Sequence, residues 1–162
     1  MAPARRPAYR VLIATHENPG GDAVGSMSAA AMALSGLGKQ VRTYIHADST
    51  IPHEVSFLNT NSLERTVDPA SLQGWSLLAL DCGNERRIGP GFDALLEAAD
   101  SVIDVDHHHD NSRFGTVNLI DGGAPSTAEI LARIFDELGV EITPPIAEAL
   151  YVVLVTDPGR FQ

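Results

Sequence analysis

Short apolar runs recur along this chain, separated by longer segments of mixed polarity. The short runs are rich in aliphatic and β-branched residues, a pattern typical of strands. They lie at Tyr9–Thr15, Gln40–His46, Ser76–Leu80, Ser101–Val105 and Thr116–Ile120. Because the Ser76–Leu80 run (SLLAL) is almost continuously apolar, it is expected to be a parallel strand buried on both faces.

The segments between the predicted strands carry helical signals. Asp22–Leu37 is rich in Ala and Met with apolar residues near helical spacing, and glycines end it. We expect shorter helices at His53–Leu58 and Phe92–Ala99. Ser126–Glu129 (STAE) has the pattern of a capping box at a helix start. Thr143–Pro145 (TPP) predicts the start of the last helix, since Pro suits a first turn.

The order of these elements predicts the fold class. Strands and helices alternate along the whole chain, which indicates a Rossmann-like α/β fold, a mainly parallel sheet with helices on both faces. A length of 162 residues suits one domain. Residues 1–8 are basic and Pro-rich, and no apolar run of the signal-peptide type follows. We therefore expect a disordered leader over residues 1–8 and the domain over residues 9–162.

Composition narrows the function classes. The formal net charge of -10 argues against a protein that grips long duplex nucleic acid with a basic face. A small anionic substrate stays open, because clustered carboxylates hold metals whose charge reverses the local field. The single Cys82 excludes an internal disulfide and fits the reducing cytoplasm. No apolar run approaches the roughly 18–20 residues that span a bilayer, so no membrane contact is expected.

Polar side chains collect where three predicted strands end. His16 follows the first strand, Asp81 follows Ser76–Leu80, and the stretch 106–109 (DHHH) follows Ser101–Val105. Because parallel strands end at one edge of a sheet, we expect these groups to converge. Neutral imidazole and carboxylate are ligands for Mn²⁺, Zn²⁺ or Fe²⁺. The pattern favours a metal site over a structural α/β domain with incidental histidines.

The loop after the first strand, residues 16–26 (HENPGGDAVGS), is rich in glycine. It lacks the Gly-Lys-Ser/Thr of a phosphate-binding P-loop, which argues against that class of nucleotide hydrolase. It also lacks the three-glycine spacing of a dinucleotide fingerprint. We interpret it as a tight turn that presents Asp22 at a helix N-terminus.

In order along the chain, these motifs resemble the four motifs of the DHH phosphoesterases. They are His16…Asp22-Ala23-Val24-Gly25-Ser26, Leu80-Asp81, Asp106-His107-His108…Asn111…Phe114-Gly115 and Thr156-Asp157…Gly159…Phe161. The resemblance covers nearly the whole chain and is closest to the bacterial nanoRNase/pAp phosphatases, or bifunctional oligoribonuclease and PAP phosphatases. It implies a two-metal hydrolase of short RNA oligonucleotides and pAp. Mn²⁺ is the usual metal, and Mg²⁺ is the alternative.

The resemblance also implies a ligand set. One metal would be held by Asp22, Asp81, His107 and Asp157. The other would be held by His16 and Asp81, so that Asp81 bridges the two. The family pattern has a further Asp for this second metal where the chain has Gly20. We therefore expect weaker metal binding at the His16 site and impaired hydrolysis.

Other residues take supporting roles under the same resemblance. His108, which acts with Asp81 in catalysis, would face the substrate phosphate, and Asp106 would orient an imidazole. Arg113 and Arg160 flank motif residues and are candidates for phosphate contacts. We interpret His109 as a surface residue. The pair at positions 86–87 (RR) is also expected on the surface, with steering of an anionic substrate as the alternative.

Several alternatives stay open at this level. The absence of an aspartate at position 20 fits a catalytically weakened metal- and nucleotide-binding homologue. The shared motifs also fit a cyclic-dinucleotide phosphodiesterase or a manganese pyrophosphatase. Because the chain ends inside the fourth motif, we expect it to be the N-terminal part of a protein whose C-terminal domain binds substrate. A homodimer is left open.

Overall fold

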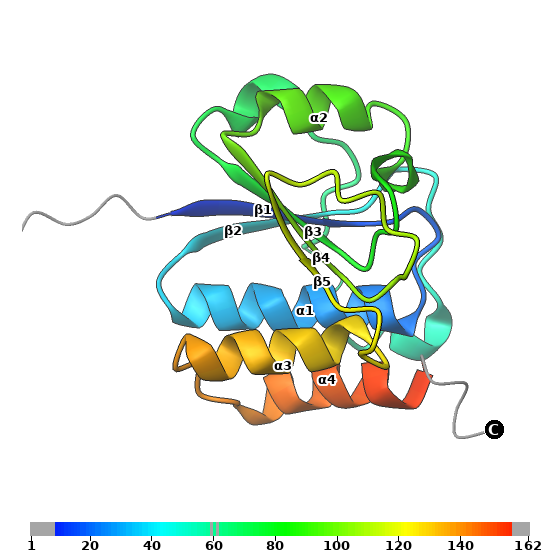
Figure 1. Cartoon of the computed structure of the whole chain (residues 1–162), viewed down its shortest axis with the longest axis vertical. Coiled ribbons are helices and arrows are strands. Elements are labelled where there is room, and N and C mark those ends of the chain that lie inside the picture. The colour runs from blue at the N-terminus through cyan, green and yellow to red at the C-terminus, as the bar shows by residue number, and fades with distance from the viewer. Residues whose placement is uncertain (1–8, 59, 61, 157–162) are drawn as a thin grey trace, which may run out of the picture.

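The architecture is a single parallel sheet between two layers of helices (Figure 1). The computed structural model describes residues 9–156 except 59 and 61. All four strand pairs are parallel, and the strand order is β2-β1-β3-β4-β5. The strands are β1 (Arg10–Thr15), β2 (Gln40–Tyr44), β3 (Ser76–Leu80), β4 (Ser101–Asp106) and β5 (Val117–Ile120). The leader predicted over residues 1–8 lies outside the described residues.

Helices cover both faces of this sheet. Three long helices lie on one face: α1 (Gly21–Gly36), α3 (Thr127–Glu137) and α4 (Pro144–Thr156). The opposite face carries α2 (Phe92–Ala98) and the short 3₁₀ turns η2 (Pro69–Leu72) and η3 (Glu85–Ile88). A third 3₁₀ turn, η1 (His53–Val55), packs near α1. The α/β fold predicted from the sequence is confirmed.

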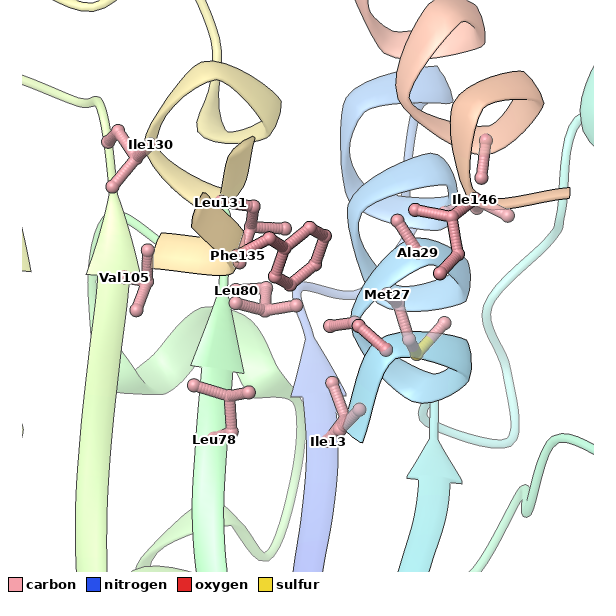
Figure 2. Close-up of a cluster of buried hydrophobic side chains, with 14 of the residues drawn as sticks. Ile13, Met27, Ala29, Leu78, Leu80, Val105, Ile130, Leu131, Phe135 and Ile146 are labelled. Carbon is pink, nitrogen blue, oxygen red and sulfur yellow. The ribbon is translucent and has the colours of Figure 1, made fainter. Parts of the chain in front are cut away.

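Alternate residues of the central strands contribute to two separate hydrophobic cores, one on each face of the sheet. Ile13, Leu78 and Leu80 point toward α1 and α3, where Phe135 fills the space between helix and sheet (Figure 2). Their neighbours, including Leu12, join the core beneath α2. Because successive side chains of a strand point to opposite faces, an unbroken apolar run is the sequence signature of this arrangement.

Two glycines of α1 permit close packing against α4. A Cβ at Gly25 would lie 2.5 Å from Cγ2 of Val153 and 2.7 Å from the carbonyl oxygen of Ala149. A Cβ at Gly21 would overlap the side chain of Thr156. The end of α4 is thereby brought against the start of α1, next to the carboxyl ends of the strands.

Every strand lies within two residues of its predicted boundaries, but two local predictions were wrong. The segment expected to be a helix at His53–Leu58 forms only the η1 turn. Ser126 precedes α3, yet its buried Oγ has no hydrogen-bond partner in the described part of the chain. The capping box does not form: the Glu129 carboxylate pairs with Arg133, and the N–H of Thr127 at the helix start donates to Asp22 of α1. None of the described helices has the length and apolar character needed to cross a membrane.

Candidate metal centre

The carboxyl ends of three adjacent strands bring the predicted residues together. In the register of the sheet, Thr15 of β1 pairs with Leu80 of β3, which pairs with Val105 of β4. The Oγ1 of Thr15 donates to the Leu80 carbonyl at 2.8 Å and ties the first two strand ends. His16 and Asp81 follow directly after this pair, so side chains that are distant in the sequence become neighbours.

Asp81 occupies an unusual backbone conformation at the end of β3. Its φ is +55°, in the left-handed region that non-glycine residues rarely adopt, and its N–H donates to the Val105 carbonyl at 3.1 Å. Such a conformation costs on the order of 1–3 kcal/mol and persists where surrounding structure enforces it. Here it turns a nearly buried carboxylate toward the cavity at the edge of the sheet.

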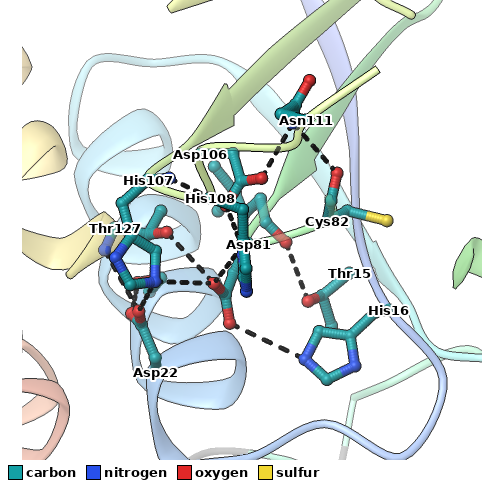
Figure 3. Close-up of polar contacts among 12 residues, drawn as sticks. Thr15, His16, Asp22, Asp81, Cys82, Asp106, His107, His108, Asn111 and Thr127 are labelled. Atoms are coloured by element: carbon teal, nitrogen blue, oxygen red, sulfur yellow. Dashed lines mark hydrogen bonds and ion pairs between the residues drawn. The ribbon is translucent and has the colours of Figure 1, made fainter. Parts of the chain in front are cut away.

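The Asp81 carboxylate lies between two imidazoles (Figure 3). Its Oδ2 is 3.6 Å from Nε2 of His16, and its Oδ1 is 3.6 Å from Nε2 of His107. The same His107 nitrogen is 3.5 Å from Oδ2 of Asp22. These separations exceed a good hydrogen bond. They are close to the roughly 3.0–3.4 Å between two ligand atoms that each bind one ion at about 2.1 Å.

The proton positions on the imidazoles suit metal binding. Nδ1 of His16 lies 2.7 Å from the Glu17 carbonyl oxygen, which can only accept, so Nδ1 carries the proton. Nε2 is then left with its lone pair toward Asp81. His107 directs Nε2 to the two carboxylates and has Nδ1 3.4 Å from the Ala124 carbonyl oxygen. The donor set therefore fits divalent cations with mixed nitrogen and oxygen ligands.

Asp106 lies in the same cluster but is used differently. Asp81, Asp106, His107 and His108 each offer a ligand atom, all within 4.8 Å of one another. However, Asp106 is completely buried, and its two oxygens accept hydrogen bonds from the His107 N–H, His108 Nδ1 and the Asn111 amide at 2.7–2.8 Å. Burial alone would raise the pKa of Asp106, but the bonds from Asn111 and His108 lower it below its ordinary value. This geometry suits an ionised group that orients His108.

The charge around His108 favours its protonated form. Burial lowers the pKa of His108, but the hydrogen bond and charge of Asp106, together with the charge of Asp81, outweigh burial and raise it. Since Nδ1 is engaged by Asp106, Nε2 is the nitrogen available to a ligand. His108 lines the cavity and is about one-third exposed.

Hydrogen bonds from two helices hold the carboxylates in place. Asp22 sits in the first turn of α1, where the helix dipole stabilises negative charge. Its Oδ1 accepts from Ser26 Oγ at 2.9 Å, and its Oδ2 accepts from the Thr127 N–H at 3.1 Å. Thr127 also donates through Oγ1 to Asp81 at 3.3 Å. The start of α3 thus fixes two carboxylates that come from different elements.

A cavity opens at this cluster, on the edge of the sheet where the strands end. Its volume is about 250 Å³, and its lining includes His16, Asp22, Asp81, His108, Thr156 and the backbone of residues 20–21.

The family model of the DHH family, N-terminal domain, matches residues 10–153. This chain belongs to the DHH family. The match takes in every residue that lines the cavity of this DHH domain except Thr156, at the end of α4.

Relatives of this DHH domain include proteins with assigned names. It is 35% identical over 154 residues to the bifunctional oligoribonuclease and PAP phosphatase NrnA of Thermus thermophilus, covering 94% of this chain and 44% of that protein. The Bacillus subtilis protein of the same name is 28% identical over 159 residues, covering 93% and 47%. The chain spans a little under half the length of these relatives.

The fold also has a match among solved structures. An exopolyphosphatase-related protein from Bacteroides fragilis superposes with a TM-score of 0.83 at 22% identity, covering 96% of this chain and 48% of that one. At that level of identity the likeness establishes the fold and no more. It agrees with the parallel sheet and helical layers described above.

The DHH domain brings together most of the residues expected at the site. His16, Asp22, Asp81, His107 and His108 converge at the sheet edge. As expected, His109 is exposed. Two further expectations, Asp157 as a ligand and Arg160 as a phosphate contact, lie outside the described residues.

Arg113 is not brought into this cluster. It is exposed in a loop with φ +54°, where its N–H donates to Oδ1 of Asn111 at 2.6 Å. Among the described residues, no hydrogen bond or ion pair joins its side chain to the residues that line the cavity. Its role as a phosphate contact stays a prediction.

Sequence reasoning missed two neighbours of the cluster. Thr127 was placed at a helix start and given no role at the cluster, although it bonds to two carboxylates. Arg87 was expected on the surface beside Arg86, but only Arg86 is exposed. Arg87 is half-buried, with Nη2 3.4 Å from Nδ1 of His16, because the η3 turn after β3 folds it back over the site. Its place only six residues after Asp81 was the available signal.

Cys82 is buried beneath the cluster. Its Sγ lies 3.1 Å from the Asn84 carbonyl oxygen, and burial raises the pKa of the thiol. A thiol held in its protonated form is a poor nucleophile. Cys82 is therefore a small buried residue and not a candidate nucleophile.

Proposed function

We propose that this domain is the metal-binding half of a phosphoesterase that hydrolyses short RNA oligonucleotides from an end and converts pAp to AMP and phosphate. The observation that carries the proposal is the Asp81 carboxylate, which lies between Nε2 of His16 and Nε2 of His107. Membership of the DHH family and the names of the Thermus thermophilus and Bacillus subtilis relatives support it.

The donor set favours Mn²⁺ over Mg²⁺. Imidazole nitrogens contribute on both sides of Asp81, whereas Mg²⁺ prefers oxygen ligands. Asp22, Asp81 and His107 would hold one cation, with Asp157 as the expected fourth ligand. His16 and Asp81 would hold the other. When bound, such a pair makes water nucleophilic near neutral pH and neutralises charge that builds on the phosphate oxygens.

The side chains around the cavity supply the remaining chemistry. Burial lowers the pKa of His108, but Asp106 and Asp81 together outweigh burial and raise it, so the protonated ring would donate from Nε2 to a non-ester oxygen of the phosphate. Asp106 keeps the ring in that orientation. Water oxygen bonds to phosphorus as the bond from phosphorus to the ribose oxygen breaks, and the departing oxygen takes up a proton. The products are a nucleoside monophosphate, or AMP and phosphate.

A second candidate function is a weakened, metal- and nucleotide-binding homologue. Gly20 lines the cavity, where the family pattern has an aspartate, and it contributes no side chain. On the His16 side, the described residues then offer only His16 and the shared Asp81 as ligands. A cation there would be bound more weakly than its neighbour.

Assays of the full-length protein with pAp and the dinucleotide ApA, with Mn²⁺ present, test the proposal. We expect AMP and phosphate from pAp, and adenosine and AMP from ApA. Asp81→Asn should abolish both reactions, whereas His109→Ala, at an exposed neighbour, should not. Hydrolysis of neither substrate would contradict the proposal. Turnover of a cyclic dinucleotide or pyrophosphate alone would point to another branch of the family.

A further inference from the structure

Arg87 is a cation beside the site, and the proposed function assigns it no role. Its backbone carbonyl accepts the Glu17 N–H at 2.6 Å, which anchors it against the His16 loop. Its Nη2 is 3.4 Å from Nδ1 of His16. That nitrogen already donates its proton to the Glu17 carbonyl, so it cannot accept from Arg87. The guanidinium donors are therefore not used by His16.

Arg87 also lacks the kind of acidic partner that Arg42 and Arg133 have. Arg42 pairs with Glu64 at 2.7 Å, and Arg133 pairs with Asp121 and Glu129 at 3.0 Å. Among the described residues, no carboxylate lies within ion-pair distance of Arg87. In a chain of net charge -10, a half-buried guanidinium without such a partner can bind an anionic ligand.

Gly83 keeps the space between Arg87 and His108 open. A Cβ placed on Gly83 would lie 3.8 Å from Nη1 of Arg87 and 3.7 Å from Cβ of His108. The side chains of Arg87 and His108 therefore lie on either side of the position that a Cβ of residue 83 would occupy. Because residue 83 is glycine, no side chain separates them. A phosphate that contacts both would lie near the Asp81 cluster, since Nδ1 of His108 is 3.7 Å from Oδ1 of Asp81.

The two proposed substrates present different phosphates to these groups. A terminal phosphate has three non-ester oxygens and carries nearly two negative charges at neutral pH. A phosphodiester has only two non-ester oxygens and one charge. In the proposed function, bound cations and His108 would engage the oxygens common to both. The third oxygen of the terminal phosphate is left for a fork of N–H donors, which guanidinium provides.

Resting on the proposed function, we infer that Arg87 is a specificity residue, which binds the terminal phosphate of monoesters such as pAp and contributes little to phosphodiesters. Arg87→Met should lower kcat/KM for pAp about 10- to 100-fold more than for ApA, the effect of losing a charged hydrogen bond. Arg87→Lys should be intermediate, because it keeps the charge without the fork. Arg86→Met removes the same charge from the exposed neighbour and should change neither substrate's kcat/KM.

A titration with Mn²⁺ separates this role from simple support of His16. Arg87→Met should leave Mn²⁺ affinity within about twofold of the wild type, because Arg87 is no metal ligand. Equal losses for pAp and ApA, or a large fall in Mn²⁺ affinity, would overturn the inference.

Binding of two small probes tests Arg87 independently of catalysis. With Mn²⁺ present, Arg87→Met should weaken the binding of inorganic phosphate about tenfold and leave that of dimethyl phosphate unchanged. If the wild type hydrolyses neither pAp nor ApA, the proposed function fails, but these probes still decide the role of Arg87. Equal effects on the two probes would contradict it.

Discussion

Oδ1 of Asp106 lies 2.7 Å from Nδ1 of His108, and the Asp106 side chain is completely buried. The same carboxylate accepts hydrogen bonds from the His107 N–H and the Asn111 amide. One buried group therefore fixes the backbone of a proposed ligand and the ring of a proposed phosphate contact. Its position between them accounts for the spacing of the Asp-His-His motif.

Replacing Asp106 with Asn should disturb these hydrogen bonds, although the two side chains have nearly the same shape. Because the amide cannot accept all three hydrogen bonds and carries no charge, the pKa of His108 should fall, as measured by NMR titration of the metal-free protein. Hydrolysis should fall about 10- to 100-fold, as for other groups that orient metal-site residues. Asp110→Asn, at an exposed position of the same loop, is the control. An unchanged His108 pKa would show that Asp106 does not set its protonation.

Gly20→Asp should restore the carboxylate that the family pattern has at this position. Gly20 has φ −85°, and a Cβ added to it would meet no atom within 4 Å, so the side chain fits without strain. The affinity of the weaker Mn²⁺ site should rise at least about tenfold, and turnover should rise with it. Gly20→Asn is the matched control, because it too can cap α1 but lacks the charge. If the Asp and Asn variants behave alike, the missing carboxylate is not what limits the site.

Gly25→Ala should destabilise the fold through the contact between α1 and α4. The added methyl group would lie 2.7 Å from the backbone oxygen of Ala149, so a helix must shift. We expect a loss of about 1–3 kcal/mol in the free energy of unfolding, measured by denaturant titration. Gly36→Ala adds the same methyl group where no atom lies within 4 Å, and it should cost nothing. Equal stabilities of the two variants would argue against close packing at Gly25.

Asp104 should make stability depend on pH. It is completely buried, its oxygens have no hydrogen-bond partner among the described residues, and burial raises its pKa to about 7. In the unfolded chain the pKa is about 3.9, so between about pH 4 and 7 the folded state binds more protons. Stability from this group is thus present below about pH 4 and is lost as the pH rises to about 7, by up to about 4 kcal/mol.

Asp104→Asn should remove that part of the pH dependence. Urea titrations from about pH 4 to 8 should give a flatter profile of unfolding free energy for the variant than for the wild type. Asp136→Asn, at an exposed position of α3, serves as the control and should keep the wild-type profile. Parallel profiles for wild type and Asp104→Asn would mean that Asp104 titrates normally in the folded protein.

The fold could be predicted because local patterns and tertiary contacts agree. The run Ser76–Leu80 is apolar because both faces of β3 are covered, so the apolar pattern in the sequence predicted the observed burial. Strand ends could then be aligned by topology alone, which placed His16 and Asp81 at one edge. The helix start at Ser126 was also correct as a position, although its capping contact was not.

The parts that the sequence did not reveal depend on contacts between distant elements. Thr127 bonds to Asp22 and Asp81 only because α3 begins against the edge of the sheet. Arg87 reaches His16 because a 3₁₀ turn folds back after β3. Neither contact leaves a periodic signal, since each involves a single polar residue in a short connection.

Counting the ions bound by the full-length protein tests the central claim, that Asp81 joins two cation sites. The metal-free protein would be titrated with Mn²⁺ beside Asp81→Asn, His16→Ala and the exposed control His109→Ala. We expect two ions per chain in the wild type and the control, one in His16→Ala, and much weaker binding of both in Asp81→Asn. No bound Mn²⁺ in the wild type, or unchanged binding in Asp81→Asn, would contradict the claim.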